Sequence, residues 1–370
     1  MAMLILSGPA GYAPALMTPA ALAPARASVA YMMAEEPSKS FSAEILETAK
    51  DEEEEAFAKE AAELAAVARS PETIAAQRAL AEAAVAALRE RPEVAAVLEK
   101  TAKPSGKIAK ALRKPSGSMA LIGEGVNLGV GDTLGAVSMM GGYDMNDPSY
   151  LSGEFRKGGV SVVSGTMTYD FALTENDLAA VVKEQATAKG EFPGPCPVIC
   201  RAPFIDPLQL AQASLDGAIG CVLPMVLHDK ESMGELMASC EKLGMEALVR
   251  VNDAEQMAVA VELGAGIIVV GDISLPDATA LVADLPKGKN GVVTVADLRY
   301  LDVRGGWQVR DAGFNALFTG ASMLEVCVRD RVPPTALCKA VLQKGSVKYG
   351  LGMQKGRLEG SKEFLGSIAM

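Results

Sequence analysis

A (β/α)8 barrel that begins near Met119 is the fold predicted by the sequence, and two observations predict it. Short apolar runs recur along the chain, and a helix-like stretch follows each of them at intervals of about 20 to 42 residues. Continuous apolar strands that alternate with helices indicate a parallel sheet buried on both faces. The eight predicted strands are 119–122, 160–163, 197–200, 220–223, 247–251, 267–270, 292–295 and 316–319.

Eight such units in one domain favour a closed barrel over an open sheet. A doubly wound open sheet is the structural alternative, but no glycine-rich G-x-G-x-x-G turn opens a first strand–helix unit. The hydrophobic fraction of 49% is ample for a buried core, while aromatic residues make up only 5%. The formal net charge of −11 makes the chain a poor candidate for binding a nucleic-acid backbone, so no nucleic-acid partner is predicted.

Residues 1–34 are rich in Ala, Pro, Met and Ser, and Arg26 is their only charged residue. An acid-free leader of this kind, placed before an acidic body, is typical of an organelle-targeting segment, here a plastid (chloroplast) one. An ordinary tail without a targeting role is the alternative. A membrane span is not predicted, because proline interrupts the segment every five residues from Pro9 to Pro24.

Residues 35–118 read as an acidic helical extension, because Ala and Glu dominate them and both are strong helix formers. Pro71 and Pro92 stand where helices are expected to start. The acidic run 51–55 is interpreted as a solvated helix face. Between 73 and 98, roughly helical spacing predicts an apolar stripe made of Ile74, Leu80, Ala84, Ala87 and Leu88.

The six cysteines lie mostly in apolar runs and are interpreted as core thiols of a reducing compartment. Cys196 and Cys200 are four residues apart, but no second pair and no histidine accompanies them, so a zinc site is not expected. His228 is the only histidine, which excludes mechanisms that need two. We interpret it as a surface loop residue. No metal and no cofactor is predicted.

Catalytic and binding groups of a (β/α)8 barrel lie at the carboxyl ends of its strands. The first strand ends at Glu124, the third at Arg201, and the fifth carries Arg250. The sixth ends at Gly271-Asp272, the seventh at Asp297, and the eighth is followed by 320–322, Gly-Ala-Ser.

Four segments carry a resemblance to indole-3-glycerol-phosphate synthase. The stretch 200–209, CRAPFIDPLQ, resembles the third-strand motif of that family, and 243–253, LGMEALVRVND, resembles its fifth strand. The stretches 263–268, LGAGII, and 313–324, GFNALFTGASML, match the family in order and spacing. The resemblance is good from about 195 to 325, and weaker but collinear from 119 to 177.

The resemblance implies a barrel that closes the indole ring of an anilino-ribulose phosphate, with loss of carbon dioxide and water. Such chemistry needs a general acid, a general base, and donors for a phosphate and a carboxylate. Glu124 fits the family's first-strand Glu, and Gly320 and Ser322 fit its phosphate-binding residues on the eighth strand. Asp206-Pro207 is expected to cap the third helix.

Most of the remaining catalytic positions are changed. The family's Lys two residues after Glu124 is Val126, its third-strand Lys is Arg201, and its fifth-strand Glu is Arg250. Gly271 stands at its sixth-strand Asn, and Ala321 replaces the acidic residue between Gly320 and Ser322. The seventh-strand S-E-S-G reads TVAD (294–297), which puts the Asp297 carboxylate at the position of the family's phosphate-binding glycine.

Two functional hypotheses follow. In the first, the barrel has lost its chemistry and serves as a binding or structural component in a plastid, within a larger assembly such as a photosynthetic one. In the second, the chain is a divergent but active synthase of tryptophan biosynthesis, in which Glu124, Arg201, Arg250 and Ser322 form a rebuilt site for a residual small anion. Alternatively, the two arginines only neutralise Glu124 and Asp297 across the barrel mouth. A different phosphosugar-binding barrel family is a third hypothesis.

The helical extension and the Gly/Lys-rich tail 344–370 are the candidate surfaces for a protein partner, since their charges contrast. Trp307 lies where the chain is about two residues longer than the family. It is interpreted either as part of a loop packed on the barrel or as a partner-contacting tip.

Overall fold

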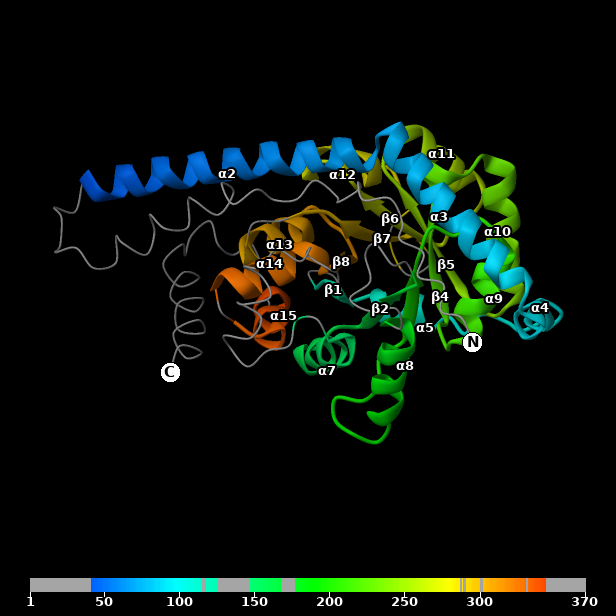
Figure 1. The fold of residues 1–370 in the computed structure, drawn as a ribbon. Helices are drawn as coiled ribbons and strands as arrows, with labels where there is room; N and C mark the ends of the chain where they lie inside the picture. The colour runs from blue at the N-terminus through cyan, green and yellow to red at the C-terminus, as the bar shows by residue number, and fades with distance from the viewer. Residues whose placement is uncertain are drawn as a thin grey trace, which may run out of the picture.

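The computed structural model confirms the (β/α)8 barrel. It describes residues 41–114, 118–125, 145, 147–167, 177–286, 288, 291–299, 302–330 and 332–343. The predicted leader and tail, and Val126 with the loop that follows it, lie outside this part of the chain. Eight parallel strands close in chain order, from β1 next to β2 round to β8 next to β1 (Figure 1).

Each predicted strand is present, within three residues at either end. The strands are β1 (Ala120–Glu124), β2 (Val162–Thr166), β3 (Val198–Arg201), β4 (Gly220–Pro224), β5 (Glu246–Val251), β6 (Ile267–Gly271), β7 (Val293–Asp297) and β8 (Ala316–Phe318).

Helices cover the outside of the strands. They are α7 (Pro148–Gly158), α8 (Asp177–Thr187), α9 (Pro207–Leu215), α10 (Lys230–Lys242), α11 (Ala254–Glu262), α12 (Leu275–Val282), α13 (Val303–Asp311), α14 (Gly320–Asp330) and α15 (Pro334–Leu342), with the short helix η2 (Met225–Leu227) after β4. Asp206 caps α9 as predicted: its side chain accepts from the Leu208 backbone N–H, Gln209 completes the capping box, and Pro207 is the first helical residue.

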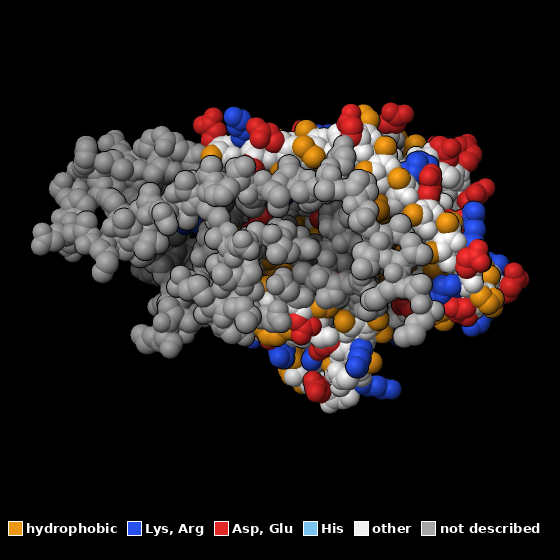
Figure 2. Space-filling view, viewed as in Figure 1, with side chains coloured by type: hydrophobic (Ala, Val, Ile, Leu, Met, Phe, Trp, Pro, Cys, Tyr) orange, Lys and Arg blue, Asp and Glu red, His pale blue; other side chains and the backbone are white. Residues whose placement is uncertain are grey.

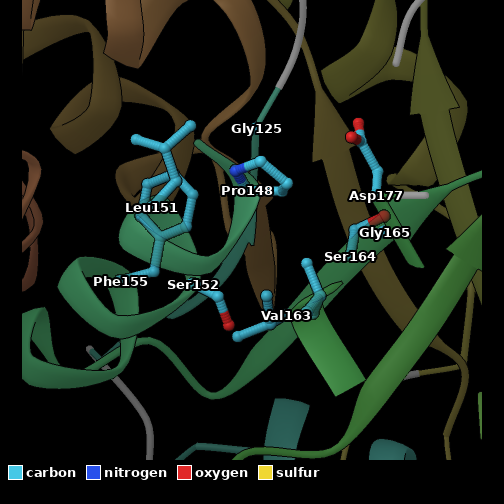
Figure 3. Close-up of a pocket in the computed structure, with 10 residues that line it drawn as sticks. Gly125, Pro148, Leu151, Ser152, Phe155, Val163, Ser164, Gly165 and Asp177 are labelled. Atoms are coloured by element: carbon cyan, nitrogen blue, oxygen red, sulfur yellow. The ribbon is translucent and has the colours of Figure 1, made fainter. Parts of the chain in front are cut away.

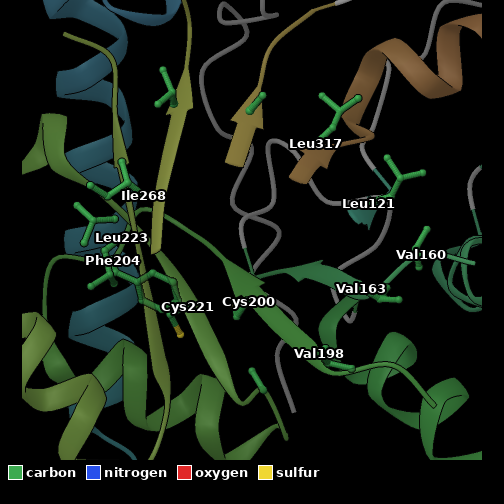
Figure 4. Packing of buried hydrophobic residues seen from close by; sticks show 14 of the residues in the cluster. Leu121, Val160, Val163, Val198, Cys200, Phe204, Cys221, Leu223, Ile268 and Leu317 are labelled. Atoms are coloured by element: carbon green, nitrogen blue, oxygen red, sulfur yellow. The ribbon is translucent and has the colours of Figure 1, made fainter. Parts of the chain in front are cut away.

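Apolar side chains fill two layers, one inside the barrel and one between the strands and the helices. The outer layer is shown in Figure 4, where Cys200 and Cys221 lie on neighbouring strands among aliphatic side chains. Contacts here are close: a Cβ at Gly123 would lie 2.6 Å from the Phe155 ring. All six cysteines are free thiols; five are buried core residues, and Cys196 is half-buried, with its pKa raised by burial to about 11.

A short helix, α5 (Lys107–Leu112), closes the amino-terminal end of the barrel. Ile108 and Leu112 are fully buried and join the interior apolar layer. The Glu246 carboxylate, at the start of β5, accepts hydrogen bonds from the backbone N–H groups of Ile108 and Ala109, both at 2.9 Å. The carboxylate thus satisfies the free donors at the start of this helix.

Three further helices precede α5: α2 (Phe41–Ala68), α3 (Pro71–Arg89) and α4 (Pro92–Leu98). Pro71 and Pro92 begin α3 and α4, as predicted. The predicted apolar stripe of α3 was partly wrong. Its buried face consists of Ala81, Val85 and Leu88, whereas Leu80 is 39% exposed, and Ala84 and Ala87 are exposed. Alanine on every side of this helix leaves the apolar periodicity ambiguous.

Trp307 lies in α13 and is half-buried, with its indole Nε1 donating to the Ala340 carbonyl oxygen of α15 at 3.3 Å. The prediction of a loop was therefore wrong, because Trp307 lies on a helix, and its indole takes part in the packing of the barrel. No helix in the described part of the chain is long and apolar enough to span a membrane.

Candidate functional site

The top layer of the barrel interior is charged. Glu124, Arg201, Arg250 and Asp297 come from β1, β3, β5 and β7, at the carboxyl ends of these strands. Alternate strands supply one layer of inward-facing side chains in this fold, so these four residues share a level. The residues two positions earlier, such as Ile199 and Leu248, belong to the apolar interior layer beneath.

Five side chains form one chain of ion pairs of alternating sign, which we call the mouth network: Glu124, Arg201, Asp297, Arg250 and Asp272. Arg201 Nη1 lies 2.9 Å from Glu124 Oε2, and its Nη2 lies 2.8 Å from Asp297 Oδ2. Arg250 Nε lies 3.0 Å from the same Asp297 oxygen, and its Nη1 lies 2.7 Å from Asp272 Oδ2. Asp297 is therefore the bridge between the two arginines.

The backbone beside β6 accommodates Arg250. A Cβ at Gly271 would lie 2.6 Å from Arg250 Nη2, so only glycine leaves room for the guanidinium in this position. Asp272 has φ of 55°, in the left-handed region that non-glycine residues rarely adopt. Its bond to Arg250 is consistent with a conformation held by the network.

The pKa values of the two carboxyl groups that contact Arg201 are shifted in opposite directions. Burial alone would raise the pKa of Asp297, but Arg201 and Arg250 together overcome it and hold that pKa below its ordinary value. Burial is the dominant influence on Glu124, which is 3% exposed, and it raises the pKa of this carboxyl despite the nearby Arg201. Ser164 of β2 also donates to Glu124 Oε1, at 3.1 Å.

The predicted site residues thus meet at one place, but they satisfy one another. Arg201 and Arg250 keep their protons at ordinary pH, and their carboxylate partners raise the pKa of both. Glu124 is the carboxyl group of the network whose pKa is raised. The three carboxylates and two guanidinium groups carry a formal net charge of −1, which disfavours a phosphate dianion.

Gly320 and Ser322 lie at the start of α14, after β8. Gly320 is the first residue of this helix and has φ of 47°, and Ser322 is buried within the first turn. A helix start of this kind can offer backbone N–H groups to an anion. Beside the mouth, a cavity of about 10 Å³ lies between β2 and α7, lined by Ser152, Ser164 and Asp177 among others (Figure 3). It is large enough for about one water molecule.

His228 follows η2 and lies apart from the mouth network. It is half-buried, with Nε2 2.7 Å from the Phe204 carbonyl oxygen, so the expectation of a surface residue was only partly right. Burial lowers its pKa. Among the residues that the structure describes, no three His, Cys, Asp or Glu side chains are grouped to hold a metal ion.

Two members of the site were missed from the sequence. Asp272 was noted as a strand end but not as a partner of Arg250, and Ser164 lies one residue beyond the predicted second strand. An acidic residue directly after β6 was the available signal for Asp272, because neighbouring strand ends meet at the same rim of a barrel.

Comparison with known proteins supports the resemblance. The model of the indole-3-glycerol phosphate synthase family matches residues 146–324, from just before α7 into α14. Over these residues, just under half of the chain, the sequence is similar to that family.

Two relatives illustrate how far the similarity extends. The indole-3-glycerol phosphate synthase of Lachnoclostridium phytofermentans is 24% identical over 192 residues, covering 48% of this chain and 65% of the relative. The multifunctional tryptophan biosynthesis protein of Schizosaccharomyces pombe is 42% identical over 80 residues, covering 21% of this chain and 10% of the relative. The chain thus spans less than two thirds of the length of either. Glu124 lies outside the segment matched by the family model.

Proposed function

We propose that this chain is a relative of the family that is non-catalytic and serves as a binding or structural component, with the barrel kept for its shape. The observation that carries the proposal is the mouth network. At the barrel end where the family's chemistry is expected, Arg201 and Arg250 are bound to carboxylates of the same chain at 2.7–3.0 Å.

The replaced residues argue against proton transfer. A positioned general acid or base contributes about 10²–10⁴-fold to a rate, and arginine does not release its proton at ordinary pH. Arg201 stands at the family's Lys position, and Arg250 reverses the charge of the family's Glu. The costs of losing both do not simply add, because such groups act as a unit.

The charge of Asp297 argues against binding of the family's phosphorylated substrate. Its carboxylate stands at the family's phosphate-binding glycine position and already accepts from both arginines. An incoming anion has to displace this carboxylate from the two arginines. Because the carboxylate is part of the same chain, it loses little entropy when it binds them.

The helical extension supports a binding role. The outward face of α3, opposite the side packed on the barrel, carries exposed Ala76, Leu80, Ala83 and Ala87. A helix that is apolar on both faces is typically covered on both. Together with the tail 344–370, this extension is the proposed partner-binding part. The acid-free leader 1–34 is the basis for proposing a plastid location, and a larger, photosynthetic assembly there is the proposed setting.

A divergent active synthase of tryptophan biosynthesis is the second candidate, and the buried Glu124 favours it. A carboxyl with a raised pKa is the type of group that works as a general acid near neutral pH. In this alternative, an anionic substrate displaces Asp297 from Arg201 and Arg250, and Gly320 and Ser322 bind the phosphate.

A turnover assay distinguishes the two. The purified full chain is incubated with 1-(2-carboxyphenylamino)-1-deoxyribulose 5-phosphate, and the fluorescence of the indole product is followed beside an active synthase of the family. We expect no turnover by a chain that circular dichroism shows to be folded. Turnover that is lost in Glu124→Gln refutes the non-catalytic proposal. Turnover that is unchanged in Glu124→Gln indicates a contaminating enzyme, and repurification from a host lacking the synthase then decides.

A further inference from the structure

The amino-terminal end of the barrel carries a concentration of positive charge. Between residues 100 and 114 there are six basic residues and no acidic one, in a chain whose formal net charge is −11. Five lysines of this stretch are exposed, and we call them the basic face: Lys100, Lys103, Lys107, Lys110 and Lys114.

The backbone holds these lysines in place. Ala102 donates its backbone N–H to the Lys242 carbonyl oxygen at 2.9 Å, before the chain turns under the barrel. Ile108 and Leu112 are buried in the barrel interior, and Arg113 donates to the Gly291 carbonyl oxygen at 2.7 Å, just before β7. Since the apolar side chains of this segment point inward, its lysines are presented together on the outer surface.

No carboxylate of the described chain pairs with the basic face. None of its five lysines forms an ion pair with another residue that the structure describes. The Glu246 carboxylate, which accepts from the backbone at the start of α5, is buried. A group of unpaired like charges on one surface steers association with a complementary surface.

The same chain carries that complement on α2. This helix contains nine acidic and two basic residues, among them the run 51–55. Glu55 and Glu63 are exposed. Acidic side chains mark the upper edge of the molecule in Figure 2, where α2 runs in Figure 1.

The two surfaces lie at opposite ends of the barrel. The Phe57 ring of α2 lies 6.0 Å from the guanidinium of Arg299, which follows the carboxyl end of β7. The basic face lies beneath the amino ends of β5 and β7. Because of this separation, the α2 of one molecule meets a basic face only on another molecule.

We propose that the basic face binds α2 of a second copy of this chain, in a head-to-tail arrangement. A contact between two different surfaces of identical molecules is heterologous, and it produces a ring or an open chain of molecules. The overall charge of −11 disfavours an extended anionic surface such as a membrane or nucleic acid, whereas α2 is a local acidic segment. The proposal concerns the outside of the barrel and is independent of whether the mouth is catalytic.

Sedimentation velocity of the full chain tests the proposal through exchanged charges. Lys103→Glu/Lys110→Glu lowers the charge of the five-lysine basic face from +5 to +1, and Glu55→Lys/Glu63→Lys lowers the net negative charge of α2 from −7 to −3. We expect the unaltered chain to self-associate at low salt and to do so at least about tenfold more weakly at an ionic strength near 0.5 M. Each double variant alone should remain monomeric, and an equimolar mixture of the two should associate again.

The matched control is Lys183→Glu/Lys339→Glu, which reverses two exposed lysines on the outer helices α8 and α15. It should associate like the unaltered chain, with all variants shown to be folded by circular dichroism. An unaltered chain that is monomeric at low salt, or a mixture that fails to associate, overturns the proposal. Binding of the monomer to anionic vesicles through the same lysines would assign the basic face to a membrane instead and likewise overturn it.

Discussion

Replacing Asp297 with asparagine tests whether net charge or hydrogen-bond geometry determines how the mouth network affects stability. By charge alone, three carboxylates face two guanidinium groups, so removing one carboxylate neutralises the site and should stabilise the fold. By geometry, Asp297 is the one carboxylate bonded to both arginines, at 2.8 and 3.0 Å, whereas Glu124 and Asp272 each contact one. We expect geometry to decide, and Asp297→Asn to destabilise.

The magnitude follows from burial. Asp297 is 14% exposed, so solvent replaces its lost bonds only in part. Each hydrogen bond to a charged group contributes about 1.5–3 kcal/mol, and removing one partner of a buried pair costs about 3–5 kcal/mol. The amide oxygen of asparagine retains part of one bond, which places the expected loss at about 3 kcal/mol. For a barrel of this size, that corresponds to a Tm lowered by about 6–12 °C.

Denaturant unfolding at neutral pH, followed by circular dichroism, measures the change in the free energy of unfolding. Glu262→Gln is the matched control, because it breaks an exposed ion pair with Lys230 that we expect to contribute less than about 1 kcal/mol. If Asp297→Asn is as stable as the control, or more stable than the unaltered chain, the network is not held by Asp297 and the reasoning fails.

Three further predictions test other parts of the structure. The pKa of Glu124 is raised, so its ionisation lowers the stability of the fold as the pH rises above the ordinary value of 4.5. Glu124→Gln should therefore gain stability relative to the unaltered chain between pH 4 and pH 7, as measured by urea unfolding. A difference in stability that stays constant with pH would contradict this. The lowered pKa of Asp297 has the opposite effect: the stabilisation by its carboxylate is present above the ordinary value of 3.8 and is lost as the pH falls through the lowered value. The difference in the free energy of unfolding between Asp297→Asn and the unaltered chain should therefore become smaller in acid. A difference that grows in acid would refute this prediction. Glu246→Gln should lower the free energy of unfolding by about 1–2 kcal/mol, because one of the two hydrogen bonds to the start of α5 is lost. The exposed control Glu241→Gln should leave the free energy of unfolding unchanged. Equal effects of the two substitutions would show that Glu246 does not anchor α5.

The sequence was sufficient to predict the strands because a strand buried on both faces has a simple sequence pattern, a continuous apolar run. The run 267–270, for example, is uninterrupted by polar residues and lies within β6 (Ile267–Gly271). The helical extension has no comparable sequence pattern to identify its buried face. In α3, alanine occupies both the buried position 81 and the exposed positions 83 and 84, so the face that packs on the barrel could not be read from composition.

The members of the site were predictable as strand ends, but their pairing was not. That Arg201 and Asp297 meet follows from alternate strands sharing a layer. That Arg250 reaches Asp272 depends on the missing side chain at Gly271 and on a left-handed backbone at Asp272, neither of which has a sequence pattern. Local conformations of this kind are set by tertiary contacts.

Calorimetric titration of the full chain with the family's substrate, 1-(2-carboxyphenylamino)-1-deoxyribulose 5-phosphate, tests most directly whether the mouth is occupied by the chain's own carboxylate. The account predicts no saturable heat at neutral pH, because Asp297 holds both arginines. Saturable binding that is lost in Arg201→Ala/Arg250→Ala variants shown to be folded would contradict it, since the two arginines would then be available to an external anion.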